Sequence, residues 1–200
     1  MSKLELLSVQ ERLRRNVEDA IAVCGGLLDG ALMTAIEVST EAILASLREG
    51  GKVILCGNGG SAADAQHLAA ELIGRFYLDR RALPAIALAD NVAAVTAIGN
   101  DYSYEDVFAR GVQALGQPGD VLIGLSTSGS SPNVTAALRV GNDAGLVTVA
   151  IVGQADCAMA ELATHTICVR GAGTARIQEG QMLVGHTIFE SVEQQLCAGL

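Results

Sequence analysis

The chain has 200 residues, enough for one α/β domain with some additional helices. Half of the residues are hydrophobic and only 3% are aromatic, so we expect an aliphatic, alanine-rich core. The formal net charge of −9 argues against a surface that binds nucleic acids or membranes in general, although local backbone donors can still bind a small anion.

The five cysteines are an odd number, widely spaced and without a C-x-x-C pair. This pattern is typical neither of a disulfide framework nor of a zinc finger. Residues 1–16 lack the apolar core of a signal peptide, and no uninterrupted apolar run approaches the roughly 20 residues of a membrane span. We therefore expect a cytoplasmic protein without membrane or nucleic-acid partners.

Two helices are predicted at the beginning of the chain. Apolar residues recur at helical spacing between about residues 4 and 24, at Leu13, Val17, Ile21 and Cys24, until a glycine pair interrupts them. A second helical pattern covers about residues 29–48 and ends at another glycine pair. The apolar faces of this helical pair fit either packing within the same chain or assembly with other copies.

Short apolar runs then alternate with helical segments. The predicted strands cover residues 53–56, 84–88, 121–125, 146–152 and 165–169. Helices are predicted from Ala62 onward and over residues 93–98, 104–115, 132–143, 159–162 and 176–197, while residues 99–101 are expected to form a turn and residues 170–174 a loop. This alternation predicts an α/β fold with a parallel sheet covered by helices on both faces.

Residues 57–61, with the sequence GNGGS, join the first strand to the following helix. Only small residues fit such a turn, and it directs backbone N–H groups and a helix N-terminus at an anion. Two alternatives stay open. Gly57, Gly59 and Ala62 satisfy a loose dinucleotide fingerprint, although the acidic residue expected after the second strand has no good counterpart. The turn can also join strand and helix without any ligand.

Residues 126–131, with the sequence STSGSS, follow the third strand and bring five hydroxyl groups to the start of a helix. Ser131 suits the N-cap and Pro132 the first helical position. Such hydroxyls can hydrogen-bond a phosphate without a cation, although a solvated capped loop would have the same sequence. Both polar loops follow strands, and parallel sheets bind ligands at the carboxyl ends of their strands.

The histidines suggest a metal site or an acid–base site. His67 and Glu71 are spaced i,i+4 on one helix, so they lie on one face. Gln178 and His186 lie roughly on one face of the last helix. Together the four side chains would form a mixed nitrogen and oxygen set that suits zinc or a similar divalent ion. Their spacing alone does not show that the two helices meet.

These motifs together resemble the phosphoheptose isomerases, a family of sugar-isomerase (SIS) domain enzymes. The resemblance rests on the glycine turn with His67 and Glu71, on residues 99–101, on the serine loop, and on residues 176–179 with His186. It implies that residues 1–200 form a single SIS domain, in which a helical pair (1–50) precedes an α/β core (51–200). The implied fold is a three-layer, flavodoxin-like sandwich with a five-stranded parallel sheet. The implied assembly is a homotetramer with active sites between subunits.

The resemblance also implies an activity, which is the conversion of sedoheptulose 7-phosphate to D-glycero-D-manno-heptose 7-phosphate through an enediol. This reaction is the first step toward nucleotide-activated heptose. Carried over residue by residue, the family's zinc ligands fall on His67, Glu71, Gln178 and His186, and its proton carriers on Glu71 and His186. The substrate contacts fall on Asn58, Gly59, Gly60, Ser61, Glu71, Asn100, Asp101, Ser126, Thr127, Ser128, Ser131 and Gln178.

The main alternative is a non-catalytic SIS protein that binds a sugar phosphate or a protein partner. The DnaA initiator-associating protein resembles this chain in its glycine turn and in the stretch at residues 175–179. The same resemblance implies that it lacks counterparts of Glu71 and His186, both of which this chain has. The isomerase is therefore the favoured interpretation, with a related sugar phosphate as an alternative substrate.

Overall fold

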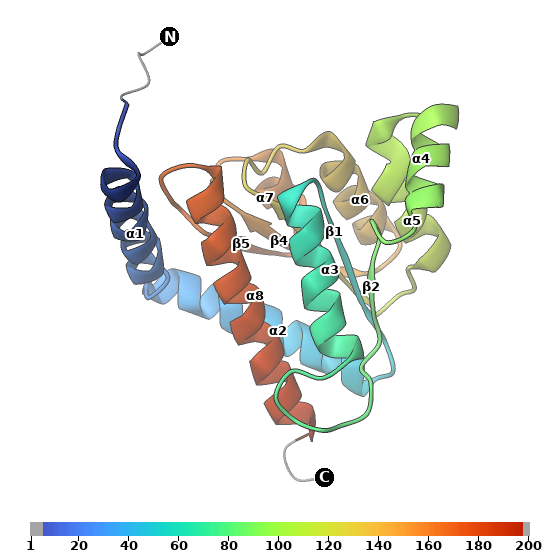
Figure 1. Cartoon of the computed structure of the whole chain (residues 1–200). Coiled ribbons are helices and arrows are strands. Elements are labelled where there is room, and N and C mark those ends of the chain that lie inside the picture. The colour runs from blue at the N-terminus through green and yellow to red at the C-terminus, as the bar shows by residue number, and fades with distance from the viewer. Residues whose placement is uncertain (1–5, 198–200) are drawn as a thin grey trace.

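A five-stranded parallel sheet forms the middle layer of the protein, whose computed structural model describes residues 6–197 (Figure 1). The strands are β1 (Val53–Gly57), β2 (Ala85–Ala87), β3 (Val121–Ser126), β4 (Val147–Val152) and β5 (His165–Cys168). Their order is β2-β1-β3-β4-β5, and each neighbouring pair is parallel. The predicted sheet is confirmed. Its connections reverse direction between β1 and β3, which is where such sheets bind ligands.

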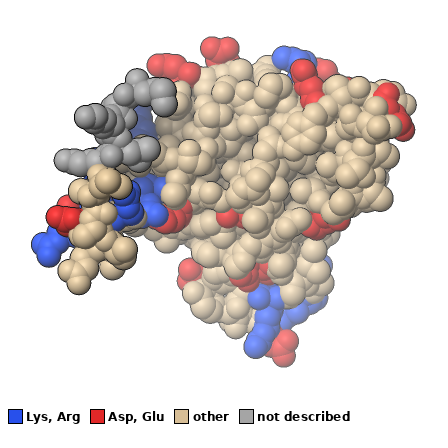
Figure 2. Space-filling model, turned by 45° about the horizontal axis from the view of Figure 1, so that its top comes forward, with Lys and Arg blue, Asp and Glu red and all other residues tan. Residues whose placement is uncertain are grey.

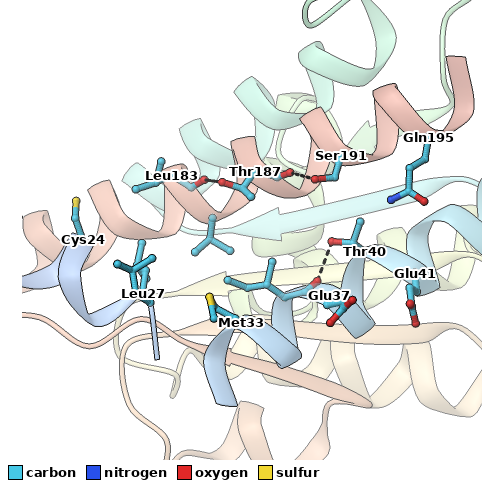
Figure 3. A pocket seen from close by; sticks show the side chains of 13 residues that line it. Cys24, Leu27, Met33, Glu37, Thr40, Glu41, Leu183, Thr187, Ser191 and Gln195 are labelled. Carbon is cyan, nitrogen blue, oxygen red and sulfur yellow. Dashed lines mark hydrogen bonds between the residues drawn. The ribbon is translucent and has the colours of Figure 1, made fainter. Parts of the chain in front are cut away.

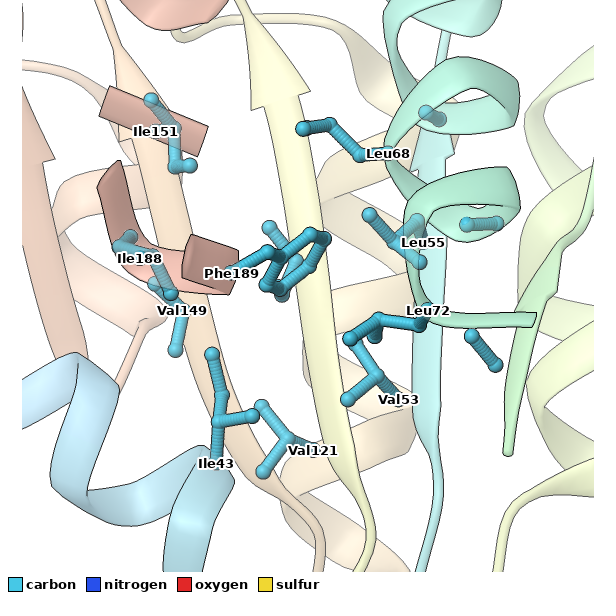
Figure 4. Packing of buried hydrophobic residues seen from close by; sticks show 14 of the residues in the cluster. Ile43, Val53, Leu55, Leu68, Leu72, Val121, Val149, Ile151, Ile188 and Phe189 are labelled. Carbon is cyan, nitrogen blue, oxygen red and sulfur yellow. The ribbon is translucent and has the colours of Figure 1, made fainter. Parts of the chain in front are cut away.

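One face of the sheet is covered by α2 (Gly30–Arg48), α3 (Gly60–Ile73) and α8 (Thr174–Cys197), with α1 (Val9–Gly26) beside α8. Figure 4 shows how Ile43 from α2, Leu68 from α3 and Phe189 from α8 point toward the strands. All three side chains are buried, in a cluster made almost entirely of aliphatic residues. The expectation of an aliphatic core is therefore confirmed.

The opposite face is covered by α5 (Val107–Leu115), α6 (Pro132–Asp143) and α7 (Ala158–Leu162). Phe108, Leu138 and Met159 from these helices are buried against the strands. The shorter α4 (Val92–Asp101) and a 3₁₀ turn, η1 (Tyr104–Asp106), follow β2. The predicted three-layer sandwich is confirmed by this second cluster.

Several predicted boundaries were wrong. The first helix begins at Val9 because Ser8 and Glu11 form a capping box, in which each side chain accepts a hydrogen bond from the other's backbone N–H. Residues 4 and 5 lie outside the described part of the chain. The α3 helix begins two residues earlier than predicted, at Gly60, and α8 begins at Thr174, inside the predicted loop.

Residues 99–101 were predicted to form a turn, but they are the last residues of α4. Asn91 caps this helix by accepting a hydrogen bond from the backbone N–H of Ala94, and Gly99 does not end it. A glycine inside a helix costs only about 1 kcal/mol, which tertiary contacts readily offset. Residues 104–106 are a 3₁₀ turn, so the α-helix predicted from residue 104 begins at Val107 instead.

Among residues 6–197, α2 is the one helix long and apolar enough to cross a membrane by length and composition. It packs against α8 and β5, and a third of its apolar window is buried within this chain. The core helix of an α/β protein meets the same criteria, so this helix is weak support for a membrane span.

Candidate functional site

The two polar loops meet at the carboxyl ends of β1 and β3, which are neighbouring strands. Gly59 has a φ of +55°, a conformation that side chains with a Cβ rarely adopt. Gly60 begins α3, and a Cβ on Gly60 would overlap the side-chain amide of Gln178 from α8. The glycine turn thus permits both the change in chain direction and the close approach of a predicted site residue.

The serine loop is held together by its own hydroxyl groups. Ser126 Oγ lies 3.0 Å from Ser131 Oγ and 3.3 Å from Ser128 Oγ, and it accepts a hydrogen bond from the Gly129 N–H. Ser131 is the N-cap residue of α6, but its side chain makes no capping hydrogen bond to the helix. Pro132 has no N–H, and the Val134 N–H donates to Asn133 Oδ1, so the backbone N–H of Asn133 is the donor that the first turn of α6 offers to an anion.

A pair of asparagines connects the two loops. Asn58, in the glycine turn, and Asn133, in the first turn of α6, each donate a 2.8 Å hydrogen bond to the other's side-chain oxygen. The hydroxyl of Tyr104 in η1 donates a further hydrogen bond to Asn58 Oδ1. Asn133, whose side chain is buried, and Tyr104 were not among the predicted site residues, and the sequence offered no signal for either.

Three of the four predicted metal ligands form a cluster between α3 and α8. His67 Nε2 lies 3.2 Å from Glu71 Oε1 and 3.0 Å from His186 Nε2. The side chain of His67 is 52% exposed and that of Glu71 is 23% exposed, so ligands can reach the cluster from solvent. We call His67, Glu71 and His186 the histidine–carboxylate cluster. The two helices do meet, which the sequence alone had left open.

The fourth predicted ligand, Gln178, reaches from α8 to the first residues of α3. Its side chain packs over Gly60 and shares a hydrogen bond with Asp64, which precedes His67 by one helical turn. The pKa of Asp64 is raised above its ordinary value, mainly because the carboxyl group is partly buried. The hydrogen bond with Gln178 and the charges of His67 and His186 act in the opposite direction but more weakly. One Asp64 oxygen, Oδ2, is buried without a hydrogen-bond partner among residues 6–197. Asp64 was not among the predicted site residues, although its i,i+3 spacing from His67 was a usable signal.

The donor set fits a zinc ion. One suitable donor atom from each member of the histidine–carboxylate cluster lies within 4.8 Å of the others. Ligand atoms of a tetrahedral zinc ion with bonds of about 2.0–2.1 Å are roughly 3.4 Å apart, close to the two distances measured here. Two imidazole nitrogens and a carboxylate oxygen are also ligands that zinc accepts in proteins.

Asn100 and Asp101 lie farther along the same edge, at the end of α4. Their side chains are exposed and hydrogen-bonded to each other, with Asn100 Nδ2 as the donor. The chain continues from them into η1, whose Tyr104 reaches Asn58. These two predicted substrate contacts are therefore connected to the glycine turn through Tyr104.

Charge is spread thinly over the face toward which these loops open. In Figure 2 much of the broad upper face is uncharged, while Lys and Arg gather on the α1 side and at the lower end. The binding of an anion at the two loops would therefore depend on hydroxyl groups, backbone N–H groups and helix N-termini.

A groove of about 620 Å³ lies away from these loops, between the end of α1, α2 and α8 (Figure 3). Its walls include Leu27, Met33 and Leu183, with Thr187, Ser191 and Gln195 along α8. None of its lining residues belongs to the predicted ligand set. The groove is thus a separate feature of the α2–α8 surface.

Known proteins with this arrangement identify the family. A SIS domain family profile matches residues 15–153. The chain is 45% identical over 185 residues to the phosphoheptose isomerase of Burkholderia pseudomallei (strain 1710b), covering 92% of this chain and 94% of that protein. The chain belongs to the phosphoheptose isomerase family of SIS-domain proteins.

Solved structures of family members have the same fold. The phosphoheptose isomerase of Neisseria gonorrhoeae superposes with a TM-score of 0.88 at 36% identity, and that of Francisella tularensis with a TM-score of 0.89 at 32% identity. Each match covers 94% of this chain and the whole of the other chain. The family resemblance, including the two N-terminal helices, is confirmed.

Proposed function

We propose that this protein is a sedoheptulose 7-phosphate isomerase, which forms D-glycero-D-manno-heptose 7-phosphate as the first step toward nucleotide-activated heptose. The observation that carries the proposal is the histidine–carboxylate cluster, because it joins acid–base groups from two helices. The activity for which the relatives are named agrees with this chemistry. A binding protein of the same fold would need the loops but not the cluster.

The reaction moves a proton between two neighbouring carbons and another between their oxygens. We assign the removal of the carbon-bound proton to Glu71, whose carboxylate is partly exposed and has no basic partner besides His67 among residues 6–197. His186 would carry the hydroxyl proton at Nε2, the atom that lies beside His67 Nε2, only while that atom is not bound to the metal. Each group then acts as acid in one half of the reaction and as base in the other.

The phosphate of the substrate would bind at the serine loop. Ser126, Thr127, Ser128 and Ser131 are the proposed contacts, with the backbone N–H of Asn133 in the first turn of α6. Asn58, Gly59, Gly60 and Ser61 from the glycine turn, and Asn100 and Asp101 from α4, would contact the sugar. Holding the phosphate far from the reacting carbons fixes the sugar's position and supplies binding energy for the chemical step.

We propose one zinc ion per subunit, held by His67, Glu71, Gln178 and His186. When bound, the ion would act as a Lewis acid that stabilises negative charge on the substrate oxygens. Gln178 already has its amide oriented by Asp64. A carboxylate cannot easily be a tight metal ligand and a free base at once, so Glu71 is expected to change partners during the cycle.

We also propose a homotetramer with sites between subunits. Val9, Leu13, Val17 and Ile21 form an exposed apolar row along α1, so this face does not serve the core of its own chain. Burying such a row against other copies is the most direct way to remove it from water. The five cysteines are free, as in a reducing compartment, which supports a cytoplasmic location.

We treat residues 1–200 as one functional unit. The matched family range ends before α8, yet α8 packs on α3 and contributes Gln178 and His186. A fragment that ends with the matched range would lose half of the proposed ligand set. This supports a single SIS domain in which the helical pair and the core act together.

The test is to follow sedoheptulose 7-phosphate by NMR with the zinc-loaded protein and with His186→Ala. We expect the wild type to form aldose phosphate and the variant to form none. Saturable binding of the sugar phosphate without product would instead favour the non-catalytic SIS protein. Product from both proteins at equal rates would remove His186 from the mechanism.

A further inference from the structure

A buried ion pair joins the end of α3 to α8 at a distance from the proposed ligands. Glu193 lies on α8 about two helical turns beyond His186. Its carboxylate accepts hydrogen bonds from the backbone N–H groups of Phe76, Tyr77 and Leu78, at 2.9, 2.7 and 3.0 Å. It also pairs with Arg80 Nε at 2.9 Å, and the two side chains are only 1% and 2% exposed.

The guanidinium of Arg80 completes the end of α3. Its Nη2 donates to the carbonyl of Glu71, and its Nη1 donates to the carbonyls of Leu72 and Gly74 and of the adjacent Arg81, all at 2.8–3.0 Å. Carbonyls at the end of a helix lack partners within the helix, and a cation is favourable there. Arg80 thus binds the backbone of Glu71 directly, whereas Glu193 holds the segment that follows α3. We call these contacts the Arg80–Glu193 network.

The network connects the same two helices that carry the histidine–carboxylate cluster. α3 carries His67 and Glu71, and α8 carries His186. The segment held by Glu193 also places the ring of Phe76 5.7 Å from the ring of His186. At the level of the cluster itself the helices are close, because a Cβ on Gly185 would overlap the side chain of Leu68. The spacing of the helices is therefore fixed at two levels.

We propose that Arg80 and Glu193 are positioning residues for the isomerase site, which set the relative position of α3 and α8 and thereby the ligand distances of the cluster. This inference rests on the proposed function. Neither residue touches a proposed ligand side chain, so both act through the backbone of Glu71 and through residues 74–79. A purely structural ion pair would stabilise the fold without changing the affinity for metal.

The chain offers a matched control in a second buried ion pair. Lys52 Nζ and Asp120 Oδ2 lie 2.6 Å apart, and the Asp120 side chain is 2% exposed. Asp120 also accepts hydrogen bonds from the backbone N–H groups of Lys52 and Gln117, before β1 and β3 begin. This pair resembles the Arg80–Glu193 network because a buried carboxylate accepts both an ion pair and backbone hydrogen bonds, although the Lys52 side chain is 20% exposed. The hydrogen bonds of Asp120 reach neither α3 nor α8.

The experiment compares Glu193→Gln, Arg80→Lys and Asp120→Asn with the wild type, in the full chain and at a temperature where circular dichroism shows all four folded. Zinc affinity is measured by competition titration, and the cobalt-substituted proteins are compared by their visible absorption. We expect zinc to bind roughly 10–100-fold more weakly to Glu193→Gln and Arg80→Lys, as is typical for residues that support metal ligands. We expect an altered cobalt spectrum for both, and wild-type values for Asp120→Asn.

Kinetics provide a second readout. In the two network variants kcat should fall while KM for the sugar phosphate changes little, because the serine loop is untouched. Wild-type zinc affinity and cobalt spectrum in folded network variants would overturn the inference, as would an equal loss in Asp120→Asn. If Glu193→Gln does not fold, Arg80→Lys still tests the inference, because this variant keeps a positive charge beside Glu193. The network variants could lose zinc binding while the wild type fails to isomerise the sugar phosphate. That result would support this inference and contradict the proposed function.

Discussion

The loops at the carboxyl ends of β1 and β3 and the histidine–carboxylate cluster between α3 and α8 are built differently. The loops, residues 57–61 and 126–131, are contiguous stretches held by backbone geometry, hydroxyl groups and one asparagine pair. The cluster combines side chains that are more than a hundred residues apart, and it exists only because α3 and α8 pack together. Substrate binding is therefore encoded locally, whereas the proposed chemistry depends on the spacing of two helices.

The largest effect is expected when the cluster loses its base. Glu71→Gln keeps the size of the side chain but removes its ability to take a proton. General base catalysis typically contributes 10²–10⁴-fold, so kcat should fall by roughly that factor. Rates are measured by NMR at saturating sugar phosphate, with circular dichroism as the control for folding. Full turnover in a folded variant would show that Glu71 is not the base.

A change in the strand-end loops should act on binding instead. Ser131→Ala removes one proposed phosphate contact, and hydrogen bonds to charged groups contribute about 1.5–3 kcal/mol. KM should therefore rise about 10-fold or more while kcat changes little. Because Ser131 makes no capping hydrogen bond to α6, the stability of the helix should not be affected.

The neighbouring substitution Ser130→Ala is the matched control for this prediction. Ser130 is exposed and is not among the proposed substrate contacts. The KM of Ser130→Ala should remain near that of the wild type. Equal increases in KM for both variants would mean that the loop as a whole, rather than Ser131, is sensitive to substitution.

Helix spacing can be tested at Gly185. Gly185→Ala places a methyl group against Leu68, which is buried and has little room to move. Overpacking of this kind typically costs 1–3 kcal/mol in the free energy of unfolding. We expect that loss in urea denaturation, together with weaker zinc binding. Gly26→Ala in α1, where a Cβ meets nothing within 4 Å, is the control and should be neutral or slightly stabilising.

The smallest expected effect is on stability in acid. Burial by itself raises the pKa of Glu193, but hydrogen bonds from the N–H groups of residues 76–78 and the charge of Arg80 together lower it below the ordinary value of 4.5. A lowered pKa in the folded state stabilises the fold above the unfolded pKa, and this stabilisation is lost as the pH falls through the folded pKa. The Tm of the wild type should therefore decline below about pH 4.5. The decline should be shallower for Glu193→Gln, and parallel curves would contradict this assignment.

Much of the fold could be predicted because its helices and strands follow from patterns among residues that are close in the sequence. Short apolar runs predicted all five strands, and the two polar loops were found because their residues are adjacent in the sequence. The turn predicted at residues 99–101 was wrong because a single glycine does not outweigh the helix that contains it. Local patterns thus identify elements better than they identify where those elements end.

Long-range contacts were beyond the reach of the sequence patterns. Spacing placed His67 with Glu71 and Gln178 with His186, but not α3 beside α8. Asn133 and the Arg80–Glu193 network went unnoticed because polar side chains that pair across the fold have no periodic signature. The loops proposed to bind substrate were thus predictable, whereas the contacts proposed to position the catalytic groups required the structure.

The most direct measurement follows solvent deuterium during turnover. The zinc-loaded wild type is incubated with sedoheptulose 7-phosphate in D₂O, and deuterium is measured by NMR at the two carbons between which the proton moves. Proton transfer by a side chain through an enediol predicts deuterium in the product, or in the recovered ketose, and none in either with Glu71→Gln. Product formed at the wild-type rate without any deuterium would contradict proton transfer by Glu71, because a proton held on its partly exposed carboxylate exchanges with solvent.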